Sequence, residues 1–153
     1  MLYTIENEQI RVEISDRGAE IMSIVGKKSG HEYLWQGDAK YWASRATVLF
    51  PICGRLTEGK YTYEGKEYEM VLHGFNKLSD HKVVAQTKES VTFELTSDEE
   101  TKKIYPFDFI FRMTYTLDGA SVKTHFTVIN EKEKDLPFSV GGHPGFNIPF
   151  VEG

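Results

Sequence analysis

Polar and apolar residues alternate along much of the chain, which is the pattern of β-strands that bury one face. The alternation is regular over residues 10–15, 109–115 and 122–128. Asp118-Gly119 stands between the last two runs, and this dipeptide favours a two-residue hairpin turn. Glu64-Gly65 separates two further runs in the same way. The pattern therefore predicts an all-β fold, a sandwich or a barrel, rather than alternating strands and helices.

Helical signals are weak throughout the sequence. The best candidate is residues 38–45, where Asp38 opens the segment and is suited to cap one short turn. Two runs of mixed charge, residues 97–103 and 131–135, are predicted to be solvent-exposed loops. We therefore expect a single β-sandwich region spanning residues 1–153, without a convincing helix.

Composition and charge narrow the class of protein. A chain of 153 residues, 40% of them hydrophobic, is long enough to bury a core without a metal or disulfide staple. Eighteen basic and 23 acidic residues give a net charge of −5, which argues against a nucleic-acid partner. Apolar runs are much shorter than the ~20 residues of a membrane-spanning helix, and no signal peptide is evident. With a single cysteine, Cys53, we expect a cytoplasmic protein.

Three short segments interrupt the alternation and contain most of the residues suited to chemistry. They are rich in glycine and proline, which is typical of irregular backbone. Irregular loops on a rigid sheet are where binding residues often lie. The segments are residues 49–56, 72–75 and 141–150.

His143, His73 and Arg55 are the candidate site residues in these segments. Histidine exchanges protons near neutral pH, so His143 is either a general acid or base or a loop residue hydrogen-bonded for shape. His73 suits either a polyhydroxyl ligand or a capped turn. Arg55 is either an anchor for ligand oxygens or the surface end of a strand. Residue spacing alone leaves these alternatives open.

Metal sites and nucleophilic sites have little support in the sequence. The five histidines lack the close spacing of common ligand motifs, and a site built from His73, His125 and His143 is disfavoured. Cys53 lies in an apolar run without an adjacent base, so it is expected to be a small buried residue. No nucleophile motif of the G-x-S-x-G type is present.

Four segments together resemble the aldose 1-epimerase (galactose mutarotase-like) family, in particular its LacX-like branch. They are residues 32–42, 49–56, 73–75 and 142–147. The resemblance implies a galactose mutarotase-like β-supersandwich that binds an aldose sugar or sugar phosphate in a cleft. It also implies interconversion of the α and β anomers by general acid/base ring opening and closure, without a cofactor or a metal.

The resemblance also implies roles for individual residues. His143 would be the general acid, His73 would hydrogen-bond the sugar near the reacting centre, and Arg55 would anchor sugar hydroxyls. Phe75 and Asn147 are the further substrate-binding residues. Trp42 and Phe146 are alternatives to Phe75 as the ring that stacks on the sugar.

The sequence departs from the family's pattern in two respects. A small residue and an arginine are expected after Phe75, whereas Asn76 and Lys77 follow, which leaves the sugar open. By resemblance the family's fold is also much longer, so this chain corresponds to its N-terminal half. The carboxylate base is then expected beyond residue 153. Three acidic residues of this chain would serve as base only in a different geometry: Glu20, Glu58 and Asp108.

Half of a fold would expose unpaired strand edges. Such edges predict a dimer or a complementing chain, and the chain alone is expected to be inactive. Two other functions remain open, a non-catalytic carbohydrate-binding protein and a hexose-6-phosphate epimerase. Basic groups beside the cleft, such as Lys77 and Arg55, would favour the latter.

Overall fold

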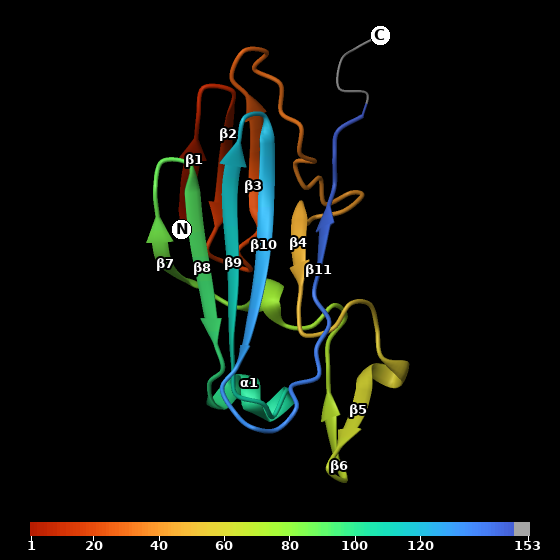
Figure 1. The fold of residues 1–153 in the computed structure, drawn as a ribbon. Coiled ribbons are helices and arrows are strands. Elements are labelled where there is room, and N and C mark those ends of the chain that lie inside the picture. The colour runs from red at the N-terminus through yellow and green to blue at the C-terminus, as the bar shows by residue number, and fades with distance from the viewer. Residues whose placement is uncertain (149–153) are drawn as a thin grey trace.

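The computed structural model of the chain describes residues 1–148 and consists mainly of antiparallel strands (Figure 1). One sheet contains β1 (Leu2–Glu6), β2 (Ile10–Ser15) and β3 (Ile21–Gly26); another contains β10 (Ser121–Asn130), β9 (Phe109–Asp118), β8 (Ser90–Thr96) and β7 (Lys82–Gln86), each in that order. Two further pairs are β4 (Ala46–Leu49) with β11 (Gly141–Pro144), and β5 (Lys60–Tyr63) with β6 (Lys66–Glu69). The helical segments are the 3₁₀ turns η1 (Thr57–Gly59) and η2 (Asn76–Leu78) and the α-helix α1 (Glu99–Ile104).

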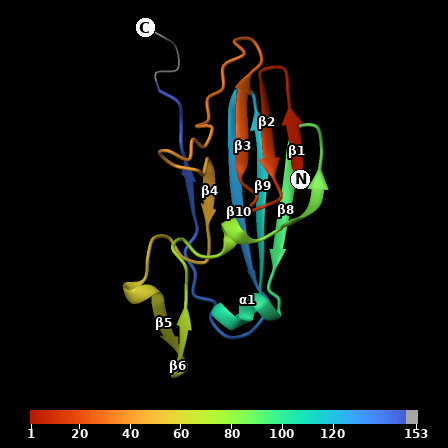
Figure 2. The ribbon, with the colours of Figure 1, turned by 180° about the vertical axis from the view of Figure 1, so that it is seen from behind.

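The two larger sheets lie face to face, with β1–β3 behind β7–β10 in Figure 1 and in front of them in Figure 2. Tyr3 of β1 meets Phe93 of β8 edge-on across this interface, with ring centroids 5.4 Å apart. The core follows the alternation in the sequence, because every second residue of β2, β8 and β9 is buried: Ile10, Val12, Ile14, Val91, Phe93, Leu95, Phe109, Phe111, Met113, Tyr115 and Leu117. The predicted all-β sandwich is confirmed.

A cluster of aromatic rings closes the lower end of the sandwich. Phe50, directly after β4, is fully buried and stacks on Phe111 with ring centroids 4.3 Å apart. Four more rings surround it within 6.3 Å: Phe75, Tyr105, Phe109 and Phe138. Since these rings come from β9 and from several loops, Phe50 joins the irregular segments to the sandwich.

The predicted hairpin turns are present. Tyr63 pairs with Lys66, and the two residues between them, Glu64 and Gly65, both have positive φ (48° and 77°). This is the backbone that a two-residue hairpin requires. In the longer hairpin Asp118 pairs with Ser121, so the turn begins at Gly119, one residue later than predicted.

The prediction of a loop without helix at residues 97–103 is wrong. α1 begins after Asp98, whose side chain accepts the N–H of Thr101 while the Thr101 hydroxyl accepts the N–H of Asp98. Glu99 and Glu100 lie in the first turn of α1, and Lys102 and Lys103 lie in its last turn. These charges interact favourably with the helix dipole. Residues 131–135 do form an exposed loop, as predicted. Within residues 1–148, no helix combines the length and the apolar content needed to cross a membrane.

The predicted short turn at Asp38 is also present. The Asp38 carboxylate accepts the N–H of Lys40, and its carbonyl accepts the N–H groups of Tyr41 and Trp42. This turn leads into β4, whose four residues are all buried. The start of β4 is held by Glu20, because one carboxylate oxygen accepts the N–H groups of Arg45 (2.7 Å) and Ala46 (2.8 Å).

β10 forms one edge of the four-stranded sheet. It is a strand of ten residues, and it pairs with β9 along its whole length. The apolar side chains that it turns toward the core, Val122, Phe126 and Val128, are only half-buried. A long edge with partly covered apolar residues is a surface on which another strand can pair.

Candidate functional site

His73 and His143 come from distant parts of the sequence and lie next to each other in the structure. His143 is on β11 and pairs with Thr47 of β4, whereas His73 lies in the loop between β6 and η2. The centroids of the two imidazole rings are 6.0 Å apart. Two groups that can donate or exchange protons therefore lie within reach of one small ligand.

Gly54 fixes the orientation of the His73 ring. The N–H of His73 donates to the Gly54 carbonyl (2.8 Å), and the N–H of Gly54 donates to Nδ1 of His73 (3.0 Å). His73 has a φ of 68°, a strained value for a non-glycine residue that is often found at functional sites. Because Nδ1 accepts a hydrogen bond, the neutral ring has its proton on Nε2 and offers it as a donor.

Protonation of His73 is expected to break its hydrogen bond from Gly54, because the second proton binds to Nδ1. Burial lowers the pKa of His73, and the nearby His143 and Lys77 lower it further. The folded protein therefore binds this proton more weakly than the unfolded chain, whose pKa is about 6.5. The free energy of unfolding should therefore decrease as the pH falls from about 6.5, the pKa of the unfolded chain, to the lower pKa of the folded state.

An NMR titration measures this effect directly. The His73 ring and the Gly54 amide should shift together, with a midpoint below the ordinary histidine value of about 6.5. In the His73→Ala variant the Gly54 amide should lose that transition. A wild-type His73 midpoint at or above this value would contradict the prediction.

Trp42 covers one side of His143. The two rings meet at 61° with centroids 5.0 Å apart. The indole N–H of Trp35 donates to the Trp42 carbonyl (2.8 Å) and holds the Asp38 turn in place. A Cβ at Gly145 would lie 3.0 Å from the Trp42 ring and 3.1 Å from Cβ of Trp35, so glycine permits this packing. Trp42 is one of the rings expected to stack on a sugar, but nothing in the sequence links it to His143.

Two basic residues belong to the segments that contain or contact His73. Arg55 follows Gly54 directly and is exposed. Lys77 follows His73 by four residues, and its positive charge contributes to the lowered pKa of His73. Within the described residues, neither Arg55 nor Lys77 forms an ion pair with an acidic side chain. Both are therefore available to bind hydroxyl or anionic groups of a ligand.

Phe75 lies in the core, which corrects its expected role in substrate binding. Its ring is 4% exposed and packs against Phe50 and Tyr105, so it is not available to stack on a sugar at the surface. The side-chain amide of Asn147 donates to the carbonyls of Glu32 and Leu34 (both 3.0 Å). These hydrogen bonds anchor the segment that follows β11. A binding role for Asn147 stays a prediction.

No acidic side chain contacts the histidine pair within residues 1–148. The carboxylate of Glu20 holds β4, and Asp108 forms an ion pair with Lys102 (2.6 Å), which lowers the pKa of Asp108. Nor do the described histidine, cysteine and acidic side chains form a cluster that could hold a metal ion. Cys53 is exposed, which corrects the expectation of a buried residue.

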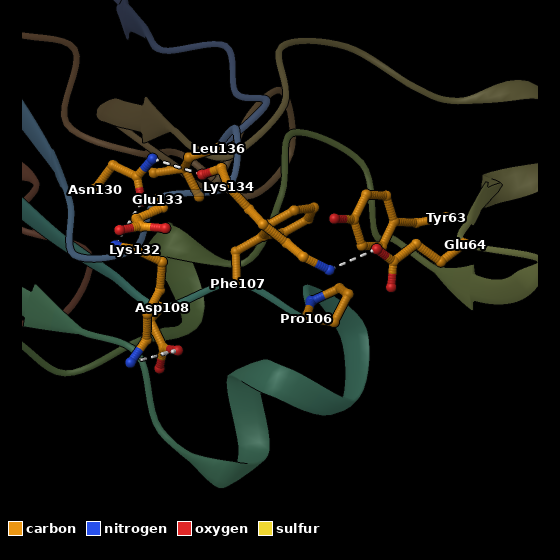
Figure 3. A pocket seen from close by; sticks show the side chains of 10 residues that line it. All are labelled: Tyr63, Glu64, Pro106, Phe107, Asp108, Asn130, Lys132, Glu133, Lys134 and Leu136. Atoms are coloured by element: carbon orange, nitrogen blue, oxygen red, sulfur yellow. Dashed lines mark hydrogen bonds and ion pairs between the residues drawn. The ribbon is translucent and has the colours of Figure 1, made fainter.

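Of two pockets in the described residues, one is lined by His143 and the other by neither His73 nor His143. A pocket of about 140 Å³ lies between β10 and β11 and is lined by His143, Phe126 and Tyr115, among others. A larger one, about 470 Å³, is lined by Tyr63 and Phe107, among others, and by neither His73 nor His143 (Figure 3). Both of its lysines are engaged in ion pairs, Lys134 with Glu64 (2.8 Å) and Lys132 with Asp108 (3.7 Å). The candidate site is therefore placed at the histidines and not at the larger pocket.

Known proteins match this chain in both sequence and fold. The family described as Aldose 1-epimerase matches residues 1–152. Protein LacX from a Lactococcus lactis plasmid is 38% identical over 100% of this chain and 53% of its own length. A galactose mutarotase related enzyme from Lactobacillus acidophilus is 48% identical, with a TM-score of 0.96 over 97% of this chain and 50% of that chain. A galactose mutarotase-like protein from Lactobacillus casei is 37% identical, with a TM-score of 0.93.

The extent of these matches matters as much as their similarity. The chain spans about half the length of the relatives it matches, in sequence and in structure. The matched half superimposes closely, so the sandwich and its two histidine segments have the same fold as in those proteins. The family match covers nearly the whole of these 153 residues, and the chain belongs to the aldose 1-epimerase family.

Proposed function

We propose that the chain binds an aldose beside His73 and His143 and takes part in the interconversion of its α and β anomers. The observation on which the proposal rests is the pair of imidazole rings 6.0 Å apart, in a chain of the aldose 1-epimerase family. The fixed Nε2–H of His73 supports it, because sugar oxygens are hydrogen-bond acceptors.

Anomer interconversion requires two proton transfers. A base removes the proton of the anomeric hydroxyl, the bond between the anomeric carbon and the ring oxygen breaks, and an acid protonates that oxygen. Rotation about the C1–C2 bond and reversal of these steps closes the ring on the other face. In the proposal His143 is the acid, His73 donates to a sugar oxygen near the reacting centre, and Arg55 binds sugar hydroxyls.

The base in this proposal is a carboxylate from outside these 153 residues. Glu20 and Asp108 support this indirectly, because both are engaged elsewhere in the fold. Residues 1–153 are then the N-terminal half of an aldose 1-epimerase-like domain, without mutarotase activity alone. The long edge of β10 suits either a second copy or a complementing chain that supplies the missing strands.

The first test is binding of D-glucose and D-galactose to this chain, followed through the His73 and His143 ring signals by NMR. Mutarotation is then measured by polarimetry after the chain is joined to the second half of the Lactobacillus acidophilus relative. In that joined protein, His143→Ala is expected to lower the rate by about 10²-fold or more, since a general acid contributes about that much.

His125→Ala is the control, because His125 is exposed on β10 and lies outside the proposed site. This variant should retain the wild-type rate. An unchanged rate in His143→Ala would contradict the assignment of the acid. Sugar binding without mutarotation in the joined protein would instead support a non-catalytic carbohydrate-binding protein.

A sugar phosphate is the second candidate ligand, as for a hexose-6-phosphate epimerase. Arg55 and Lys77 favour it, because Arg55 follows Gly54, whose N–H bonds the His73 ring, Lys77 lowers the pKa of that ring, and neither forms an ion pair in the described part of the chain. Replacing the sugars by their 6-phosphates in the same NMR experiment distinguishes the two, since phosphate binding weakens with added salt.

A further inference from the structure

Asn76 is a fully buried polar residue just after the segment that contains His73. Its side-chain amide donates to the carbonyls of Gly18 (3.0 Å) and Val48 (3.3 Å), and its backbone N–H donates to the carbonyl of Phe50 (3.2 Å). Val48 belongs to β4, the strand that pairs with His143 on β11. One side chain therefore ties the His73 loop to the strand that supports His143.

His81 completes this connection. Its Nε2 lies 3.0 Å from Oδ1 of Asn76, and its Nδ1 lies 3.0 Å from the carbonyl of Asp16. Asn76 cannot be turned over, since its amide nitrogen faces two carbonyls. The Asp16 carbonyl already accepts the backbone N–H of His81 (3.0 Å). Oδ1 of Asn76 has no other donor among the described residues, so we place the proton of the neutral ring on Nε2, where it is donated to Asn76, and Nδ1 then faces the Asp16 carbonyl without a proton between them.

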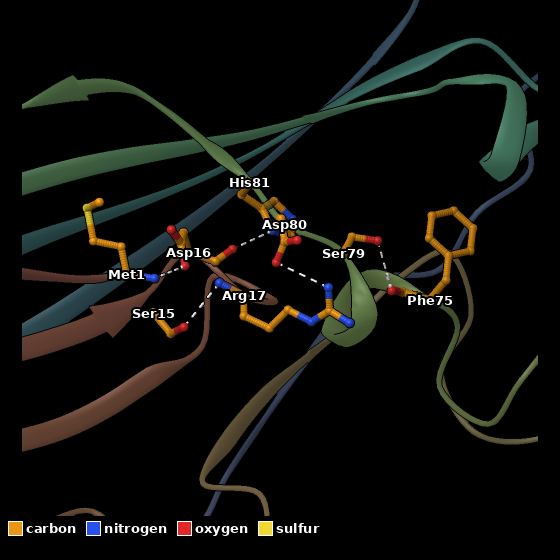
Figure 4. A network of polar contacts seen from close by, with 8 residues as sticks. All are labelled: Met1, Ser15, Asp16, Arg17, Phe75, Ser79, Asp80 and His81. Atoms are coloured by element: carbon orange, nitrogen blue, oxygen red, sulfur yellow. Dashed lines mark hydrogen bonds and ion pairs between the residues drawn. The ribbon is translucent and has the colours of Figure 1, made fainter.

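The segment around His81 is itself well anchored (Figure 4). Arg17 forms an ion pair with Asp80 (3.1 Å), and the Ser79 hydroxyl donates to the carbonyl of Phe75 (3.0 Å). The N-terminal amine binds the carboxylate of Asp16. His81 is thus a fixed donor, 6% exposed, rather than a mobile side chain.

We propose that Asn76 and His81 are positioning residues that hold His73 at its distance and orientation relative to His143. The expected effect on sugar affinity rests on the proposed function, whereas the effect on the His73 ring is a property of the protein without ligand. Two contacts fix the loop at either side of Gly74: the hydrogen bonds of His73 with Gly54 and those of Asn76 with β4. Without the second, the segment from His73 to Asn76 keeps the backbone hydrogen bond of Asn76 to Phe50 but loses the side-chain tie to β4.

The test compares variants of the full chain by ¹⁵N NMR of the His73 ring and by affinity for D-galactose. Asn76→Ala removes every side-chain contact, and His81→Phe keeps a ring of similar volume but removes the donor. In both variants the His73 signals should change from a fixed Nε2–H tautomer to an average of tautomers. D-Galactose affinity should fall by about tenfold or more, because misplaced groups lose their joint contacts with the ligand.

His81→Gln is the rescue variant, since its amide nitrogen can occupy the place of Nε2 and donate to Asn76. It should restore the His73 tautomer and most of the affinity. Val91→Ala, in β8, is the control for stability: it weakens the core at a residue 1% exposed but should leave His73 unchanged. If Asn76→Ala does not fold, His81→Phe with its Gln rescue decides the question.

The outcomes separate the two proposals. A fixed His73 tautomer in folded Asn76→Ala or in His81→Phe would overturn the positioning role. The same loss of tautomer in Val91→Ala would overturn it as well, because any loss of stability would then suffice. If the tautomer responds as expected but the wild-type chain binds no sugar, positioning stands and the proposed function fails.

Discussion

Gly74→Ala is expected to destabilise the protein more than alanine at any other glycine within residues 1–148. A Cβ at Gly74 would lie 2.1 Å from the carbonyl oxygen of Phe50, which is backbone and cannot rotate away. The residue also has a φ of 76°, where alanine is strained. We expect a loss of about 3 kcal/mol or more in the free energy of unfolding, measured by urea denaturation.

Gly65→Ala is a matched control for this prediction. Gly65 has almost the same φ, 77°, but a Cβ there would meet no atom within 4 Å. Only the backbone strain remains, so the expected loss is about 1–2 kcal/mol. The difference between the losses of unfolding free energy in the two variants measures how closely the backbone at Gly74 approaches the carbonyl of Phe50. Equal losses would show that the approach is looser than the structure indicates.

Phe50→Ala is expected to cost about 3–5 kcal/mol of unfolding free energy, because it leaves a cavity among five aromatic rings. Phe50 is 0% exposed and stacks on Phe111. Its carbonyl also accepts the N–H of Asn76, so collapse around the cavity should disturb the His73 loop. Urea denaturation measures the stability, and the Gly54 amide shift reports on the loop.

Phe138→Ala serves as the comparison for Phe50→Ala. Phe138 belongs to the same cluster, 6.1 Å from Phe50, but is 46% exposed. Water can fill the space it leaves, so we expect a loss of about 1 kcal/mol or less. A loss as large as that of Phe50→Ala would mean that ring contacts, rather than burial, stabilise this end of the sandwich.

Strands and turns were predictable because their signals are local. The alternation in residues 109–115 fixes which face of β9 is buried, and Glu64-Gly65 has the backbone freedom its turn needs. The helix α1 was also local but was overlooked: Asp98 and Thr101 have the spacing of a capping box, with acidic residues first and lysines last. High charge does not distinguish a loop from a short surface helix, because both are solvent-exposed.

The site was less predictable because its geometry is not local. Nothing in the sequence places His73 beside His143, since the pairing of β4 with β11 brings those segments together. The sequence also cannot tell which side of an irregular segment faces the core, and this is why Phe75 was misassigned. Asn76 and His81 were not recognised, because a buried polar network has no periodic pattern.

The orientation of His73 depends on backbone groups of Gly54 and not on the side chain that follows it. Divergent copies of such a gene can therefore exchange Arg55 or Lys77 and keep the same His73 tautomer, because the Gly54 N–H sets it. An exchange of Lys77 removes a charge that lowers the pKa of His73, so that position alters ligand preference and proton affinity together. A library randomised at these two positions is accordingly a direct way to retarget the site to neutral or anionic sugars.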